Sequence, residues 1–153
     1  MKKILITGAL GQDGIILSKK LKNKFNILGL SNNLNKKKIE GVNYIVNNLS
    51  SKKKILKIFE KFKPDIVFHL ASKNNPYTKR KKESFLINYK FNYDCSKNLI
   101  DAIIEKKINC KFIFAGSSLM FGNMKKKVNE KDVFKSDDYY AKYKIDVYKY
   151  LNT

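Results

Sequence analysis

The 153-residue chain has few of the residues from which disulfide frameworks, metal centres and membrane spans are built. Its two cysteines, Cys95 and Cys110, give neither a disulfide framework nor a metal-binding pattern. Because His69 is the only histidine, the sequence also argues against a zinc site. No apolar run approaches the roughly 20 residues of a membrane span, and no signal peptide opens the chain. We therefore expect a cytoplasmic protein that holds no metal and does not associate with a membrane.

Arginine is almost absent from a chain whose formal net charge is +20. All but one of the 33 basic residues are lysine, the exception being Arg80. Arginine is the main reader of guanine edges and the usual bidentate phosphate clamp, so its scarcity argues against specific nucleic-acid recognition. The lysines are scattered and occur with abundant Asn and Ile, as A/T-rich codon usage would produce. We interpret them as a solvated surface, and nucleic-acid binding stays an alternative that only the charge supports.

Proline and glycine are too sparse for a linker, and no internal repeat occurs, so we expect one domain over residues 1–153. Short apolar runs alternate with helical patterns, which predicts an α/β fold with a doubly wound parallel sheet covered on both faces. The predicted strands are Lys3–Thr7, Phe25–Leu30, Val42–Val46, Ile66–Leu70 and Lys111–Ala115. The predicted helices contain Leu17 and Leu21, span Ile55 to Phe62, run from about Ser84 to Lys106, and follow Ser136.

The most informative segment joins the first predicted strand to the first predicted helix. It reads Thr7-Gly8-Ala9-Leu10-Gly11-Gln12-Asp13-Gly14 and holds three of the seven glycines. Gly8 can make the tight turn, Gly11 lets the backbone approach a pyrophosphate, and Gly14 lets helix and strand pack closely. The N-terminus of the helix then offers free N–H groups to the phosphates. The predicted dinucleotide-binding residues of this turn are Thr7, Gly8, Gly11, Gln12, Asp13 and Gly14.

This Thr-Gly-x-x-Gly-x-x-Gly pattern resembles that of the extended short-chain dehydrogenases/reductases, the family of nucleotide-sugar epimerases and dehydratases. Within that family, Gly11-Gln12-Asp13-Gly14 is most similar to the GDP-mannose 4,6-dehydratases. The resemblance runs through nearly the whole chain and implies a Rossmann-like sheet of about five strands in the order 3-2-1-4-5. Because family members are roughly twice this length, it also implies a fragment that lacks the C-terminal part of the fold, including the substrate domain.

The residues after the second predicted strand bear on the choice between NAD and NADP. NAD-binding domains place an acidic residue there, roughly 20 residues past the glycines, to hold the ribose 2′-hydroxyl. Here the strand ends in Ser31-Asn32-Asn33, and no Asp or Glu occurs between Asp13 and Glu40. Lys36, Lys37 and Lys38 follow instead, so a 2′-phosphate would meet no repulsion. We therefore predict NADP as the cofactor, with Ser31 and Asn32 beside it and NAD as the alternative.

Three further segments match parts of the family that lie against the cofactor. Asn48-Leu49 stands where relatives carry Asp-Leu near the adenine, and Asn can still hydrogen-bond an exocyclic amine. His69-Leu70-Ala71-Ser72 resembles a segment whose backbone lines the cofactor, and we interpret His69 itself as a structural imidazole. Asn92 opens a segment similar to the family's Asn-x-x-Gly-Thr; it either faces the cofactor or is a buried polar residue of the helix. The cofactor contacts that the resemblance implies here are Asn48, Leu49, Leu70, Ala71, Ser72 and Asn92.

The catalytic pair of the family is Tyr-x-x-x-Lys, whose two side chains share one face of a helix. A lysine ammonium stabilises a nearby phenolate, which can then exchange a proton with a sugar hydroxyl or ketone. The motif occurs three times, as Tyr77/Lys81, Tyr93/Lys97 and Tyr140/Lys144. Only the last pair follows the fifth predicted strand by one helix, as the family pair does. We therefore predict Tyr140 and Lys144 as catalytic residues that also contact the cofactor.

The segment after the fifth predicted strand, from Ala115 to Gly122, resembles the family's Ser-Ser/Thr-x-x-x-Tyr-Gly. The match puts the catalytic hydroxyl at Ser117, which would hydrogen-bond the substrate oxygen alongside Tyr140. Dehydratases carry Glu where Leu119 stands, and some carry Asp just before it. Because leucine cannot transfer a proton, this position argues against the elimination of water.

These residues together predict an NAD(P)-dependent oxidoreductase or epimerase whose substrate is a nucleotide-sugar. One alternative is a nucleotide-sugar 4,6-dehydratase, which the glycine turn favours. Another is a non-catalytic dinucleotide-binding module, because most of the substrate site is expected to be missing. The resemblance also allows pairing into a homodimer.

Overall fold

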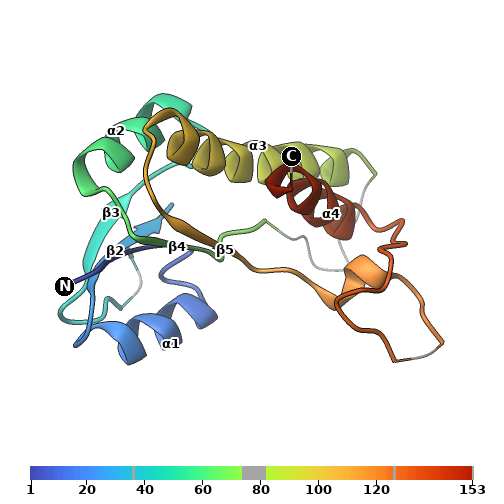
Figure 1. Ribbon diagram of the computed structural model, residues 1–153, viewed down its shortest axis with the longest axis horizontal. Helices are drawn as coiled ribbons and strands as arrows, with labels where there is room; N and C mark the ends of the chain where they lie inside the picture. Colours follow the sequence, from blue (N-terminus) through green and yellow to red (C-terminus); the bar gives the residue numbers. More distant parts are fainter. Residues whose placement is uncertain (36, 74–81, 126, 153) are drawn as a thin grey trace. The chain divides into compact units, whose positions relative to one another are not determined.

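The computed structural model describes residues 1–35, 37–73, 82–125 and 127–152 (Figure 1). By their internal contacts the residues divide into two compact units. The first unit comprises residues 1–72 and 98–115, and the second comprises residues 73–97 and 116–153. Lys36, Arg80 and the Tyr77/Lys81 pair lie outside the described residues.

A five-stranded parallel sheet in the order β3-β2-β1-β4-β5 forms the centre of the first unit. This confirms the predicted Rossmann-like fold and its strand order. Strand β1 pairs on both sides, with β2 and β4, and its Ile4, Leu5 and Ile6 are at most 1% exposed. The sheet is therefore built outward from a fully buried central strand. The strands are β1 (Lys3–Thr7), β2 (Asn26–Ser31), β3 (Asn43–Val46), β4 (Ile66–His69) and β5 (Lys111–Phe114).

Helices cover the two faces of this sheet, as right-handed crossovers require. Helix α1 (Gln12–Leu21) lies on one face, while α2 (Lys52–Phe62) and the last turns of α3 (Lys82–Glu105) lie on the other (Figure 1). The apolar residues of α2 share one face of the helix, and two of them, Ile55 and Phe59, are completely buried. The helix ends before Pro64, because the residue preceding a proline avoids the helical region, and Lys63 has a φ of +49°.

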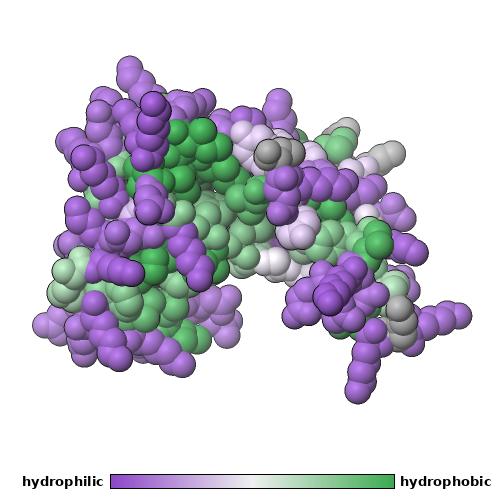
Figure 2. All heavy atoms as spheres, in the orientation of Figure 1, coloured by the Kyte–Doolittle hydropathy of each residue, from purple (hydrophilic) through white to green (hydrophobic). Residues whose placement is uncertain are grey.

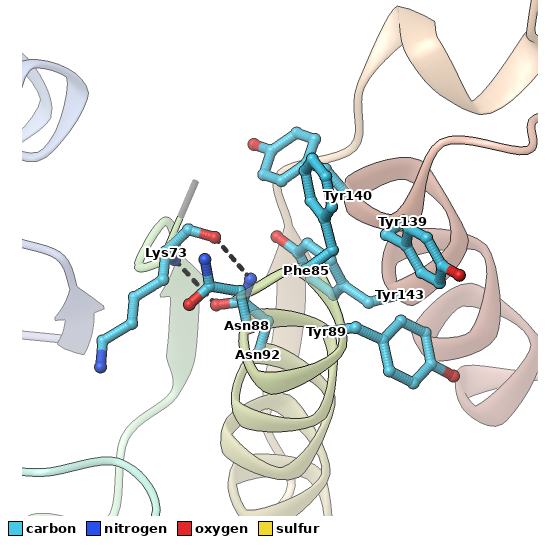
Figure 3. Close-up of a pocket in the computed structure, with 8 residues that line it drawn as sticks. All are labelled: Lys73, Phe85, Asn88, Tyr89, Asn92, Tyr139, Tyr140 and Tyr143. Atoms are coloured by element: carbon cyan, nitrogen blue, oxygen red, sulfur yellow. Dashed lines mark hydrogen bonds between the residues drawn. The ribbon is translucent and has the colours of Figure 1, made fainter. Parts of the chain in front are cut away.

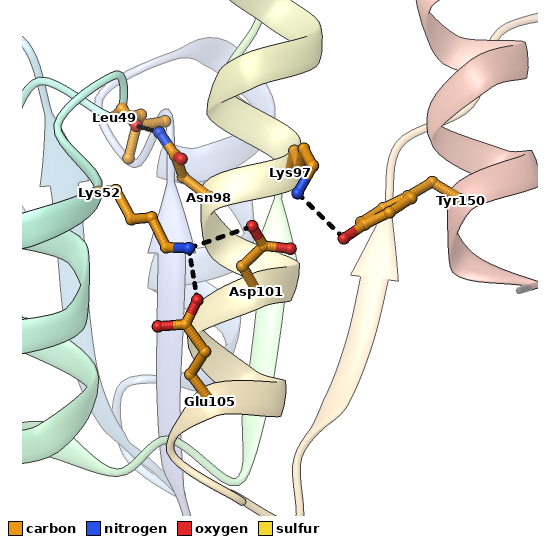
Figure 4. A network of polar contacts seen from close by, with 7 residues as sticks. All are labelled: Leu49, Lys52, Lys97, Asn98, Asp101, Glu105 and Tyr150. Carbon is orange, nitrogen blue, oxygen red and sulfur yellow. Dashed lines mark hydrogen bonds and ion pairs between the residues drawn. The ribbon is translucent and has the colours of Figure 1, made fainter.

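Polar contacts join the start of α2 to the end of α3 within the first unit (Figure 4). The Lys52 ammonium forms ion pairs with Asp101, at 3.5 Å, and with Glu105. One turn earlier in α3, the Asn98 side-chain N–H donates to the carbonyl oxygen of Leu49 at 3.0 Å. These contacts hold the segment that follows β3, where the adenine contacts are predicted.

Strand β3 departs from the expectation that both faces of the sheet are covered. Its Ile45 and Val46 are 41% and 57% exposed. Between β2 and β3 the described residues contain no helix, and in the described sheet β3 pairs with β2 alone. The apolar run does form a strand, as predicted, but its edge position leaves two aliphatic side chains in water.

The second unit contains the first turns of α3, the 3₁₀ helix η2 (Ser118–Phe121) and α4 (Tyr139–Leu151). Hydrogen bonds join α3 to α4: Tyr89 donates to Asp146 at 2.6 Å, and the Lys97 ammonium donates to the Tyr150 hydroxyl at 3.2 Å (Figure 4). Helix η2, which the sequence did not predict, packs on α4 through Met120.

The surface is dominated by hydrophilic side chains on the face shown in Figure 2, as the lysine content predicts. Among the described residues, no helix combines the length and the apolar character that crossing a bilayer requires.

Candidate active site and dinucleotide turn

The turn between β1 and α1 is held by close backbone contacts at two of its three glycines. Gly8 has a left-handed φ of +69°, and a Cβ there would lie 2.9 Å from the backbone nitrogen of Ala71. A Cβ on Gly14 would meet the carbonyl oxygen of Gly8 and lie 2.7 Å from the Cα of Ala9. At Gly11 the only such neighbour among the described residues is the Gly8 oxygen, at 3.1 Å, so they leave room beside this residue. Gly8 and Gly14 are thus required by the packing of the turn itself, and the role of Gly11 beside a pyrophosphate stays a prediction.

The first turn of α1 leaves backbone donors available to an anion. Its N-cap residue is Gly11, which has no side chain to accept from these donors. The first hydrogen bond of the helix runs from the N–H of Ile15 to the Gly11 oxygen, at 3.0 Å. The N–H groups of Gln12, Asp13 and Gly14 therefore have no carbonyl partner within the helix. Together with the helix dipole they fit the pyrophosphate of a dinucleotide.

The ends of β1 and β4 are joined through Thr7, which is completely buried. Its hydroxyl lies 2.7 Å from Nδ1 of His69 and accepts from the N–H of Ala71 at 3.2 Å. His69 is itself 2% exposed and stacks on Phe114, with the ring centroids 5.5 Å apart. The imidazole thus has structural partners, in line with its interpretation from the sequence. We infer that Thr7 and His69 position the backbone of Leu70, Ala71 and Ser72.

The end of β2 carries the side chains on which the choice of nucleotide depends. The Ser31 hydroxyl donates to the carbonyl oxygen of Asn33 at 2.7 Å, which curls the chain as it leaves the strand. Asn32 is exposed in this turn, and so are Lys37 and Lys38 further along. In the register of the sheet Leu30 pairs with Thr7, and Val46 pairs with Ser31. The residues that we predict to contact the cofactor therefore lie just after the carboxyl ends of β1, β2, β3 and β4. These four strands are adjacent, so the residues share one edge of the sheet.

The segment after β3 carries the predicted adenine contacts Asn48 and Leu49. Asn48 is exposed, and its Oδ1 accepts from the N–H and the hydroxyl of Ser50, at 3.1 and 2.9 Å. Leu49 is 8% exposed. The buried amide belongs instead to Asn47, which is 5% exposed and whose Oδ1 has no hydrogen-bond partner in the described chain. Sequence reasoning did not single out Asn47, because two adjacent Asn residues give no signal of which one faces inward.

The three predicted catalytic residues all lie in the second unit, two of them on α4. The helix begins at Tyr139, where the carboxylate of Asp138 accepts from the N–H groups of Tyr140 and Ala141, at 2.8 and 3.1 Å. An Asp at the N-cap stabilises a helix start in this way. The capped turn carries Tyr140, which is half-buried, and the next turn carries Lys144.

Lys144 is buried although it is ionisable, with 3% of its surface exposed. Its ammonium lies 5.1 Å from the ring centroid of Tyr140 and 5.1 Å from that of Tyr143. Burial lowers the pKa of this lysine to about 8, because a charged ammonium loses hydration inside the protein. The arrangement keeps this ionisable group next to the Tyr140 ring.

Ser117 is the N-cap of η2, and its oxygen accepts from the N–H of Leu119 at 3.2 Å. In the described part of the chain the Ser117 hydroxyl donates no hydrogen bond, so it is available to donate one to a ligand. Met120 packs against Ala141 and Ile145, the neighbours of Tyr140 and Lys144 in the sequence. This packing fixes the short helix that follows Ser117 against the helix that carries the predicted pair.

A small pocket lies in the second unit, between α3 and α4 (Figure 3). It has about 220 Å³ of empty space, its open mouth included. Asn92 is buried here, and its amide is occupied by Lys73: Oδ1 accepts from the Lys73 N–H and Nδ2 donates to the Lys73 oxygen, both at 2.8 Å. The lining residues are Lys73, Phe85, Asn88, Tyr89, Asn92, Tyr139, Tyr140 and Tyr143.

Comparisons with known proteins place the whole chain in a family. The sequence model of the NAD dependent epimerase/dehydratase family matches residues 4–153, and the chain belongs to this family. Among solved structures, it is similar to the UDP-Glc/GlcNAc 4-epimerase of Campylobacter jejuni, with 25% identity and a TM-score of 0.87 over 99% of this chain and 48% of that one.

Two further structures show how widely the fold is used. The UDP-glucose 4-epimerase of Thermus thermophilus, solved in complex with NAD, has 22% identity and a TM-score of 0.86 over 98% of this chain and 50% of its own. The L-threonine dehydrogenase of Clostridium difficile has 27% identity and a TM-score of 0.82 over 96% and 47%. The chain thus spans about half the length of the structures that it matches.

The crowding at Gly14 predicts the effect of adding one methyl group. Gly14→Ala is expected to destabilise the protein by about 2 kcal/mol or more, because the new Cβ meets backbone that cannot move away. Gly116→Ala is the matched control, since its Cβ would lie 3.6 Å from the Met120 sulfur, an ordinary contact. Urea unfolding of the three proteins measures both effects, and equal midpoints for the two variants would show that α1 does not pack on β1 as described.

The burial of Lys144 predicts a dependence of stability on pH. Its pKa is about 8 in the folded chain against an ordinary value of 10.5, so between these pH values the unfolded chain holds more protons. This lysine therefore makes the folded protein more stable as pH rises through that window, and burial of its charge costs stability below it. Lys144→Met should remove the dependence, stabilising the protein at pH 7 relative to pH 10 by on the order of 2 kcal/mol.

Thermal unfolding at a series of pH values measures this difference against the unchanged protein. Lys149→Met on the same helix is the control, because its side chain is 71% exposed. A difference between Lys144→Met and the unchanged protein that stays constant with pH would contradict the burial of the ammonium.

Proposed function

We propose that this chain is the dinucleotide-binding and proton-transfer part of an NAD(P)-dependent oxidoreductase or epimerase that acts on a nucleotide-sugar. The observation that carries the proposal is the buried Lys144 beside Tyr140, on the helix that follows β5 in a member of this family. The glycine turn of the first unit supports it, because the open space at Gly11 and the free donors of α1 suit a pyrophosphate. Cofactor binding is thereby assigned to the first unit and proton transfer to the second.

The chain's own residues supply the proton chemistry. When bound, a nicotinamide accepts a hydride from a carbinol carbon or returns one to a ketone. Tyr140 takes the hydroxyl proton as the carbinol is oxidised and gives it back in the reverse direction. Lys144, while protonated, stabilises the phenolate form of Tyr140. Ser117 donates a hydrogen bond to the same substrate oxygen, and the first turn of α1 holds the phosphates.

We propose a nucleotide-sugar as the substrate because of what several similar solved structures bind or act on, and not because of the fold. Several similar structures are UDP-sugar 4-epimerases, one of them solved with UDP-glucose. One is an L-threonine dehydrogenase, so the fold by itself does not require a sugar. The Ser117 and Tyr140 assignment serves either substrate, since both are oxidised at a carbinol. Homodimer formation is part of the proposal only as an expectation from the family resemblance.

A 4,6-dehydratase is the second candidate within the family, favoured by the Gly11-Gln12-Asp13-Gly14 turn. It requires an acid or base near the carbon next to the ketone. Leu119 occupies the position where the resemblance expects Glu, and its side chain is 38% exposed. Oxidation and reduction at one carbon need no such group, which is why we favour them.

NADP is proposed as the preferred nucleotide. Several similar structures were solved with NAD, so the preference rests on this chain's own residues. NADPH is expected to bind about tenfold more tightly than NADH, because Asn32, Lys37 and Lys38 offer a 2′-phosphate no negative charge. Nicotinamide fluorescence during titration of the purified chain measures both affinities.

The sharpest variant for this test is Asn32→Asp, which places a carboxylate directly after β2. It should weaken NADPH and leave NADH unchanged or tighter, since an acid there can accept from the ribose 2′-hydroxyl. Tighter binding of NADH by the unchanged chain would overturn the preference alone. Failure to bind either nucleotide would overturn the proposed function.

Turnover distinguishes the enzyme from a non-catalytic dinucleotide-binding module, the other alternative that the sequence left open. If the chain is an enzyme, Tyr140→Phe should lower the rate of hydride transfer from UDP-glucose at least a hundredfold, because the proton-transfer group is lost. Nucleotide affinity should change far less, because the phenyl ring and the phosphate-binding turn remain. Tyr148→Phe on the same helix is the control, with a side chain that is 48% exposed. Nucleotide binding without turnover in all three proteins would identify the module instead.

A further inference from the structure

One tyrosine of α4 lies between Tyr140 and Lys144 in the sequence and is buried. Tyr143 is 1% exposed, and it is among the largest side chains that the described chain buries completely. It follows Tyr140 by three residues, so the two rings share one face of the helix (Figure 3). They meet edge-to-face, with their centroids 5.4 Å apart and their planes at 76°. No motif singled out Tyr143 among the nine tyrosines, and the proposed proton transfer does not use it.

The buried ammonium of Lys144 lies against both rings, 5.1 Å from each centroid. The face of an aromatic ring attracts a cation, and the attraction is strongest where water is excluded. Tyr140 is half-buried and exchanges a proton in the proposed reaction, whereas Tyr143 is enclosed and takes no part in the exchange. Tyr143 is therefore the ring that can hold the ammonium in place throughout the reaction.

The charged and titratable groups around this cluster have contacts of their own. Asp138 accepts from the first N–H groups of α4, and Asp146 accepts from the Tyr89 hydroxyl of α3 at 2.6 Å. Burial and this hydrogen bond raise the pKa of Tyr89 to about 12, so Tyr89 stays uncharged while Lys144 titrates. The contact of η2 with α4 is apolar and is made by Met120. The ring faces therefore act on the ammonium in addition to these groups.

We propose that Tyr143 is a positioning residue whose ring holds the Lys144 ammonium beside Tyr140. This inference rests on the proposed function, and it adds to it a residue that acts through the catalytic pair rather than on the substrate. A ring face attracts the cation without neutralising it, so the ammonium stays able to stabilise a phenolate at Tyr140. A carboxylate in the same place would cancel that effect, which is why an aromatic ring suits the position.

NMR titration of the lysine side chains tests the inference in the chain without nucleotide or substrate. The pKa of Lys144 is about 8 against an ordinary 10.5, so its titration is separated from that of exposed lysines, and Lys144→Met identifies its signal. Tyr143→Phe keeps the ring face and should leave this titration unchanged. Trifluorophenylalanine at position 143 keeps the ring but withdraws electrons from its face. It should lower the pKa of Lys144 by about half a pH unit, because the charged form loses attraction.

Tyr143→Leu removes the ring face and should lower the same pKa by about one pH unit. Tyr148→Leu on the same helix is the matched control and should leave Lys144 unchanged, because the Tyr148 side chain is 48% exposed. Circular dichroism checks folding, and the fluorinated ring, which keeps its shape, decides the question if the leucine variant does not fold. An unchanged or raised pKa of Lys144 beside the fluorinated ring overturns the inference.

NADPH and NADH titrations of the same samples separate the two proposals. If a nucleotide binds while the fluorinated ring leaves the pKa of Lys144 unmoved, only the role of Tyr143 falls. If that pKa moves as expected while neither nucleotide binds, the result overturns the proposed function but not the hold of Tyr143 on Lys144.

Discussion

The contact on which the dinucleotide edge of the sheet depends is the packing of α1 against the end of β1. At Gly14 the helix lies so close to Gly8 and Ala9 that no side chain fits between them. That approach fixes the start of the helix next to the end of the central strand. Gly8 in turn lies close to the backbone of Ala71, which Thr7 holds by a hydrogen bond. One crowded turn thus positions the anion-binding donors and the neighbouring strand ends together.

Fold class and strand order could be predicted because each apolar run is bounded by a polar or glycine-containing turn, and because parallel strands need helical crossovers. Details that depend on tertiary neighbours could not be predicted. The run ending in Ile45 and Val46 is as apolar as the others, yet it forms an exposed edge, since nothing in the described chain packs over it. Helix η2 escaped prediction because four residues carry no periodicity.

Some features of the candidate site could likewise be predicted from the sequence, and others could not. Position after β5 distinguished Tyr140/Lys144 from the other Tyr-x-x-x-Lys pairs, and this choice needed only the order of elements. Sequence could not show that Lys144 is buried, because a lysine in a lysine-rich chain gives no sign of its surroundings. Burial lowers its pKa, and the faces of two tyrosine rings compensate the ammonium in part. The free energy that burial of this cation costs argues for a role that a surface lysine could not fill.

Asn88 and Asn92 show how one helix face can place the same side chain in two different surroundings. They are the same residue type, one turn apart, and nothing in the sequence tells them apart. Asn92 faces a backbone segment whose N–H and C=O match its amide, so it stabilises the chain after β4. Asn88 faces the mouth of an aromatic pocket, where the described chain offers its amide nothing. Asn88 stays partly exposed, so water can satisfy its amide, and the tertiary neighbours rather than the residue type decide which of the two side chains holds the structure together.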